Sequence, residues 1–264
     1  MTISMSLEAS GGRYGLRQLA KSEVTKISTL RSTFWTLVVT VVGTLGVTVL
    51  ATNSASHHSA MWYRGFDPTN QSMTGLAIGT LAIGILGVLS VTGEYGSGTI
   101  RSSLASTPRR PLFLFGKGLV IGAISLVVGE VLTFASFFVG QAVLGSGGAP
   151  TASLNQPGVL GAVAPAGVCL ALLGLVGFAL GVIIRHTAGA ISAFVGATFL
   201  LPVLLGPISS HPVRFTPLGI LANSVTAVIR QPGQVSPAFG LFLMTLYCAA
   251  ALAVAAVLFL RRDA

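Results

Sequence analysis

The 264-residue sequence is poor in charged side chains. They make up 8% of the chain, whereas a typical soluble domain has about 25%. Hydrophobic residues account for 52%, and the mean hydropathy is +0.85. So few charges cannot cover a water-exposed surface of this size, so most of the surface must contact lipid. This composition excludes a soluble enzyme or binding domain and predicts an integral membrane protein.

Acidic residues are especially scarce. Six Asp and Glu stand against fifteen Lys and Arg, which gives a formal net charge of +9. Basic chains can bind nucleic acid by neutralising phosphates. Here, however, the basic residues flank apolar runs and do not gather in one soluble region. A lipid bilayer accounts for them better, and we expect no nucleic-acid partner.

Cysteine and metal-ligand patterns are also missing. The two cysteines, Cys169 and Cys248, both lie in apolar runs and are expected to be small buried hydrophobic residues without a disulfide. His57 and His58 are adjacent, so their side chains point apart, and Asp67 is the only nearby carboxylate. We therefore expect no metal site. The polar and basic residues that precede a long first apolar run argue against a cleavable signal peptide.

Six apolar segments are long enough to cross the hydrocarbon core as helices, which takes about 20 residues each. Glu130 is the one charged residue inside them. The predicted fold is therefore an all-α integral membrane protein, with one transmembrane domain over residues 1–264. The predicted spans are residues 33–52, 75–93, 118–144, 159–184, 188–206 and 238–260.

Lys and Arg are distributed unevenly between the two sides of this arrangement. Twelve of the fifteen fall in the N-terminal segment, the second-to-third connection, the fourth-to-fifth connection and the C-terminus. Because cytoplasmic loops are enriched in basic residues, both termini are predicted to be cytoplasmic. Residues 1–32 have apolar side chains at helical spacing and a basic face, which predicts an amphipathic helix along the inner leaflet.

A dense polar segment, "GEYGSGTIRSSLASTPRRPLFLFGK", separates the second and third spans, and residues 94–117 form the predicted cytoplasmic loop. Within it Ile100 and Leu104 stand one helical turn apart, with Arg101 beside them, and Thr107-Pro108 ends the pattern. A helix this short is marginal in water by itself. The pattern therefore predicts a short helix that docks on a partner surface.

This segment resembles the cytoplasmic loop of type-two ATP-binding-cassette (ABC) exporter permeases. The family has an acidic residue after the second span, a Gly-Thr-hydrophobic step, a Pro-Arg pair and a Gly-Lys pair. In this sequence those are Glu94, Gly98-Thr99-Ile100, Pro108-Arg109 and Gly116-Lys117. "SEVTKISTLRSTFW" before the first span and "RHTAGAI" between the fourth and fifth are similar to other family segments. The family also has short re-entrant helices before the sixth span, for which "FTPLGILANSVTAVI" is apolar enough.

The resemblance implies a transport subunit of a bacterial inner (cytoplasmic) membrane exporter, driven by a separate ABC ATPase that binds ATP and Mg. Two permeases and two ATPases would form the transporter, with the substrate path between the permeases. The implied coupling residues are Glu94, Gly98, Thr99, Ile100, Arg101 and Leu104. Those implied to brace the loop are Pro108, Arg109, Arg110 and Lys117.

The chain itself has no Walker A motif, because Lys117 is followed by Gly118 and not by Ser or Thr. We therefore expect neither ATPase activity nor a bound cofactor in this subunit. Lys117 has two interpretations. Its side chain could extend to the inner membrane surface, or it could form a salt bridge with Glu94.

Glu130 lies near the middle of the third span, where a charge is costly and commonly faces protein or water. It could line the translocation path or bind a cationic substrate, or it could be a carboxyl group that fixes helix packing. An ion-coupled secondary transporter that uses Glu130 is the alternative function. Against that alternative, the spans show no obvious internal repeat, and the polar loop would have no purpose.

Overall fold

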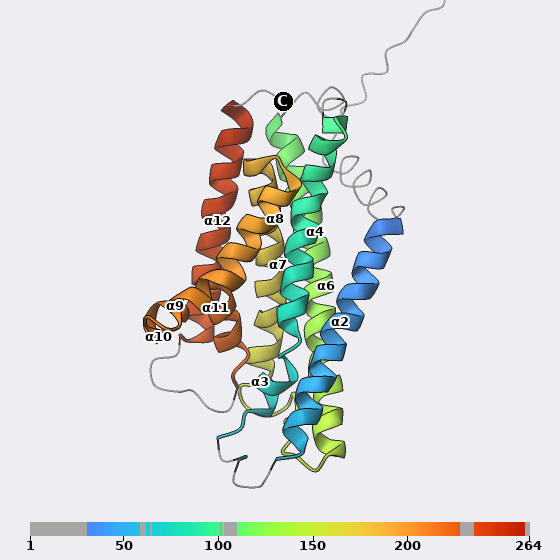
Figure 1. Ribbon diagram of the computed structural model, residues 1–264, viewed down its shortest axis with the longest axis vertical. Helices are drawn as coiled ribbons and strands as arrows, with labels where there is room; N and C mark the ends of the chain where they lie inside the picture. The colour runs from blue at the N-terminus through green and yellow to red at the C-terminus, as the bar shows by residue number, and fades with distance from the viewer. Residues whose placement is uncertain are drawn as a thin grey trace, which may run out of the picture.

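The computed structural model describes residues 31–58, 62–63, 65–100, 102, 110–227 and 235–261, and the regular structure in these ranges is helical (Figure 1). The long helices are α2 (Arg31–Ser56), α4 (Leu76–Gly96), α6 (Arg110–Ser146), α7 (Leu160–Ile184) and α12 (Pro237–Arg261). The shorter elements are α3 (Pro68–Ser72), α8 (Thr187–Val195), η1 (Gly196–Leu200), α9 (Leu201–Leu205), α10 (Ser210–Val213) and α11 (Pro217–Ser224).

Among the described residues, six helical stretches are long and apolar enough to cross a membrane, which confirms the predicted all-helical membrane protein. Five are the long helices, and the sixth is the run Thr187–Leu205, formed by α8, η1 and α9. The π-helical turn η1 ends two residues before Pro202, whose missing N–H interrupts the regular hydrogen-bond ladder. The largest difference from the expected spans is α6, which begins at Arg110 and not near Gly118.

The two ends of the bundle differ in content. The α4–α6 connection, the α7–α8 turn and the C-terminal end of α12 lie at one end, uppermost in Figure 1. We call this the coupling end, because it holds the segment that the sequence predicts to couple to a partner. The opposite end contains α3, α10 and α11. The expected re-entrant segment 215–229 therefore includes the short helix α11, and residues 228–229 lie outside the described residues. The expected N-terminal helix also lies outside them, apart from residues 31–32.

Helix α2 faces its neighbours with hydroxyl side chains. Thr40, Thr44, Thr48, Thr52 and Ser56 recur every fourth residue, and all five are buried. Residues four apart lie on one side of a helix, so this regular spacing forms a single polar seam. Short side chains along the seam let α2 pack closely against α4 and α6.

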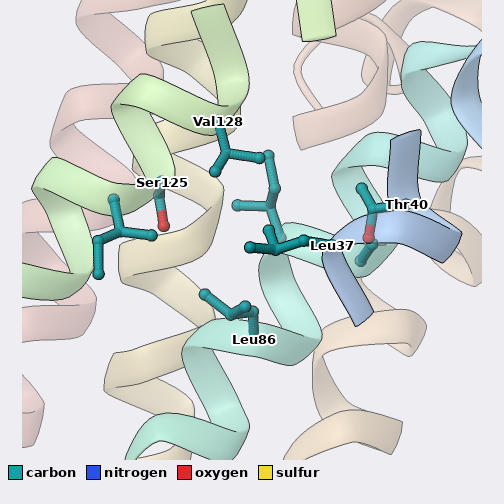
Figure 2. A pocket seen from close by; sticks show the side chains of 8 residues that line it. Leu37, Thr40, Leu86, Ser125 and Val128 are labelled. Carbon is teal, nitrogen blue, oxygen red and sulfur yellow. The ribbon is translucent and has the colours of Figure 1, made fainter. Parts of the chain in front are cut away.

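A narrow crevice lies between α2, α4 and α6, where the three helices do not pack fully against one another (Figure 2). Its lining is largely apolar, with the hydroxyl groups of Thr40 and Ser125 as the polar exceptions. The lining residues are Leu37, Thr40, Ala82, Ile83, Leu86, Ile124, Ser125 and Val128.

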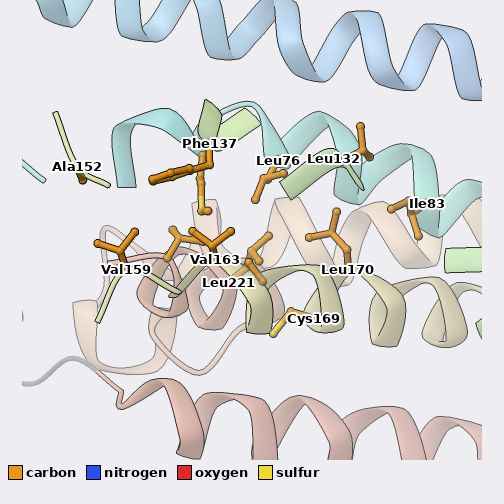
Figure 3. Close-up of a cluster of buried hydrophobic side chains, with 13 residues drawn as sticks. Leu76, Ile83, Leu132, Phe137, Ala152, Val159, Val163, Cys169, Leu170 and Leu221 are labelled. Atoms are coloured by element: carbon orange, nitrogen blue, oxygen red, sulfur yellow. The ribbon is translucent and has the colours of Figure 1, made fainter. Parts of the chain in front are cut away.

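Helix α7 is the centre of the bundle and packs against α4, α6 and α12. Its side chains contribute to the largest apolar cluster, where Leu170 lies beside Leu132 of α6 and Ile83 of α4 (Figure 3). Val163 and Cys169 of α7 belong to the same cluster. Glycines bring the backbones of α4 and α7 into contact. A Cβ atom on Gly87 would overlap the carbonyl oxygen of Gly174, and one on Gly177 would overlap that of Gly84.

The outward faces of the peripheral helices are apolar. Trp35 and Leu50 of α2, Val127 of α6 and Phe242 of α12 are all well exposed, as are Val203 and several neighbours in α9. In water these side chains would form a large unfavourable patch. Their positions around the bundle are those of a lipid-facing surface.

The end opposite the coupling end is held by a hydrogen-bond network around α3. Asp67 caps this helix, since its Oδ1 accepts from the amides of Thr69 and Asn70, while its Oδ2 accepts from Ala227 N at 2.8 Å. The Gln141 side-chain amide of α6 donates to Pro68 O and Ser72 Oγ. Helix α3 thereby ties α6 to the segment that follows α11.

Candidate coupling site at the α4–α6 connection

A buried salt bridge joins the two long helices beside the α4–α6 connection. Lys117 Nζ of α6 donates to Glu94 Oε1 of α4 at 2.8 Å, and the two side chains are 2% and 13% exposed. The Lys117 ammonium group also lies 5.7 Å from the centre of the Phe113 ring, within the range of a cation–π contact. Of the two interpretations of Lys117, the structure shows the salt bridge.

Both charged residues belong to helices and not to a loop. Helix α4 continues to Gly96, and α6 already begins at Arg110, so residues 94–96 and 110–117 of the expected loop belong to these two helices. Glu94 and Lys117 can meet because α4 and α6 run antiparallel on either side of this short connection. The salt bridge therefore fixes the spacing of the two helix ends.

A second contact holds the α7–α8 turn beside the same site. The Arg185 guanidinium lies 5.2 Å from the centre of the Tyr95 ring. Arg185 adopts a left-handed backbone conformation with φ 58° at the end of α7, and His186 caps α8 by accepting from Gly189 N at 3.2 Å. Tyr95 and Arg185 were not singled out from the sequence, which gives no direct sign of a contact between two distant turns.

Ile100 is buried within this chain, which differs from the expectation that it contacts a partner. Its side chain is 4% exposed and packs in one apolar cluster at the coupling end of the bundle. Glu94 likewise is engaged by Lys117 and is not a free polar group at a docking rim. The cluster consists of Val91, Ile100, Phe113, Ile121, Phe178, Ala179, Val182, Ala255 and Phe259.

The exposed residues in the described part of the connection are small and polar. Ser97, Gly98, Thr99 and Ser102 are all exposed. The hydroxyl groups of Ser97 and Thr99 lie 2.9 Å apart, and Ser97 Oγ donates to Gly93 O at 2.8 Å. Gly98 has φ +71°, a conformation that side chains disfavour, so glycine is required where the chain leaves α4.

Four expected site residues are not among the described residues. Arg101, Leu104, Pro108 and Arg109 lie outside the described residues. Arg110 is the first of these positions to be described again, as a half-buried residue at the start of α6. The roles expected for these residues stay predictions.

Glu130 lies in the middle of α6, well away from the coupling end. Its carboxyl group lies against Gly167 of α7, where a Cβ atom would come within 2.5–2.8 Å of the Glu130 Cδ and both carboxyl oxygens. No sequence pattern predicts a contact between these two positions. Among the described residues, no group of three His, Cys, Asp or Glu side chains could hold a metal ion.

No protein-family model matches the chain, and no curated protein is significantly similar to it. The resemblance to type-two ABC permeases therefore rests on the order and spacing of short motifs within a six-span membrane protein.

Proposed function

We propose that this chain is the membrane subunit of an ATP-driven exporter of the type-two ABC class, coupled to a separate ATPase through the α4–α6 connection. Both termini and the coupling end face the cytoplasm of a bacterial cell. Two copies form the substrate path, and two ATPases bind ATP and Mg. The proposal is supported mainly by one observation. A polar connection joins two spans, and the buried Glu94–Lys117 salt bridge holds the two helix ends that flank this connection together.

The burial of Ile100 supports a specific form of coupling. A partner that pushes on the exposed face of the connection moves Ile100, which is packed among residues of α4, α6, α7 and α12. Interiors are close-packed and transmit such displacements. The salt bridge makes the ends of α4 and α6 move together, so a force at the connection reaches four helices at once.

This form of coupling assigns the partner contact to Ser97, Thr99 and Ser102, with Ile100 as an internal anchor. Ser102 is exposed, and its hydroxyl donates to Thr99 O at 2.8 Å. Ser102→Trp adds a bulky side chain to the outer face without touching the buried cluster. We expect it to reduce co-purification of a co-expressed cognate ATPase and to reduce ATP-driven export into vesicles.

The matched control is Asn155→Trp, which adds the same side chain at an exposed position of the α6–α7 connection, at the opposite end. It should leave both measurements unchanged. Normal ATPase capture and export by Ser102→Trp would contradict the proposed contact. Transport that persists without any ATPase would instead favour the ion-coupled secondary transporter.

A further inference from the structure

Glu130 is a carboxyl group in an apolar span, and none of the described residues pairs with it. It lies in the middle of α6 and is half-buried. Within the described part of the chain, no hydrogen bond or salt bridge engages it, and Lys117, which pairs with Glu94 of α4, lies several turns earlier along α6. Ionisable groups at this depth normally face protein, water or a ligand of opposite charge.

The side chains around Glu130 on α6 favour a ligand that has an apolar body. Leu126 and Phe134 lie one turn before and one turn after it, and Phe138 follows one turn later on the same side of α6. Leu126 and Phe138 are 40% and 56% exposed, and Phe134 is partly buried. An acid flanked by exposed aliphatic and aromatic side chains matches a molecule with a positive charge and an apolar body.

The carboxyl group is also held at a defined place. It lies over Gly167, and a methyl group there would come within 2.5–2.8 Å of its atoms. On the other side of this contact, Gly129 lets α6 approach the backbone of α7 closely, because a Cβ atom there would come within 2.7 Å of Gly167 O. The Glu130 carboxyl group thus occupies the place that a side chain at position 167 would take, and we call this contact the Gly167 cradle.

From this geometry we infer that Glu130 and the Gly167 cradle form a binding site for an amphiphilic organic cation. This inference rests on the proposed function in one respect, since it names the class of molecule that the exporter carries. The binding itself requires only this chain and no ATPase. Failure of cation binding would therefore leave the coupling proposal intact, and failure of coupling would leave cation binding intact.

The test is equilibrium dialysis of the full chain in lipid nanodiscs with radiolabelled tetraphenylphosphonium, a lipophilic cation. Tetraphenylborate, an anion of nearly the same shape, serves as the charge-reversed probe. We expect saturable binding of the cation only. Glu130→Gln should weaken it by at least about tenfold, because the opposing charge is lost. Equal binding of both probes, or unchanged cation affinity in Glu130→Gln, would overturn the inference.

Gly167→Ala tests the geometry separately, because it displaces the carboxyl group and keeps its charge. It should weaken cation binding even if Glu130→Gln lowers the yield of folded chain. Gly161→Ala is the matched control on the same helix, since a Cβ atom there has nothing within 4 Å. It should bind the cation as the unchanged chain does. Unaltered binding by Gly167→Ala would show that the cradle has no part in the site.

Discussion

Lys117 and Glu94 carry opposite charges at positions that an apolar bundle would otherwise exclude from water. The Lys117 side chain is 2% exposed, and its ammonium group contacts Glu94 and the nearby Phe113 ring. Burying two charges is costly, and a hydrophobic pair of similar size can be as stable. The salt bridge is therefore better understood as a device that fixes the position of two helix ends than as a source of stability.

The first prediction concerns this pair. Glu94→Gln alone leaves the Lys117 ammonium buried without its counter-charge, which should lower the free energy of unfolding by on the order of 3–5 kcal/mol. The double variant Glu94→Gln with Lys117→Met removes both charges and should recover most of that loss. Thermal unfolding of the purified chain in detergent measures both effects. A double variant less stable than Glu94→Gln would contradict this account.

The sequence predicted residue chemistry better than residue partners. A salt bridge between Glu94 and Lys117 was one of two interpretations, because the two charges stand at the two ends of one polar segment. The location of Ile100 was not predictable, since an apolar side chain on a short helix has the same pattern whether it packs on its own bundle or on another protein. The pairing of Glu130 with Gly167 depends on how α6 and α7 pack, which no local pattern encodes.

At the scale of elements, the spans were predictable because crossing a membrane requires about 20 apolar residues. Helix α7, expected at 159–184, is observed at Leu160–Ile184. The start of α6 at Arg110 was missed because charged residues such as Arg110 and Lys117 are typical of loops between spans. Only the contacts of Lys117 in the folded bundle show that its segment is helical. Helix α3 was missed as well, since its sequence PTNQS is polar and only the Asp67-Pro68 cap indicates a helix start.

The second prediction concerns the contact between α4 and α7. A methyl group on Gly87 would overlap the backbone of Gly174, so Gly87→Ala must push the two central helices apart. The expected cost is about 1–3 kcal/mol of stability, as for other overpacked cores. Reduced melting temperature and reduced monodispersity in size-exclusion chromatography measure it.

Gly46→Ala is the control for this variant. Gly46 lies on α2, where a Cβ atom would have nothing within 4 Å. Alanine is favoured over glycine inside a helix by about 0.5–1 kcal/mol, so this variant should be unchanged or slightly more stable. If Gly87→Ala melts as Gly46→Ala does, the α4–α7 contact is looser than the structure indicates.

For the whole molecule, the sequence indicated the number of spans but not their arrangement. All six spans are apolar, so nothing in their composition marks α7 as the central helix that contacts α4, α6 and α12. Central position follows from which helices present glycines to one another. Because successive spans run in opposite directions, the α4–α6 connection and the α7–α8 turn lie at the same end of the bundle (Figure 1). The excess of Lys and Arg in these segments predicts that this end is cytoplasmic.

The third prediction tests that orientation with single added cysteines. The native Cys169 and Cys248 are both buried, with at most 3% of either side chain exposed, so they should contribute little background labelling. Asn155→Cys and Ser102→Cys place a thiol at exposed positions of opposite ends. In intact cells a membrane-impermeant maleimide should label only Asn155→Cys, and opening the cells should add labelling of Ser102→Cys. Labelling of Ser102→Cys in intact cells would place the α4–α6 connection outside the cell, beyond the reach of a cytoplasmic ATPase.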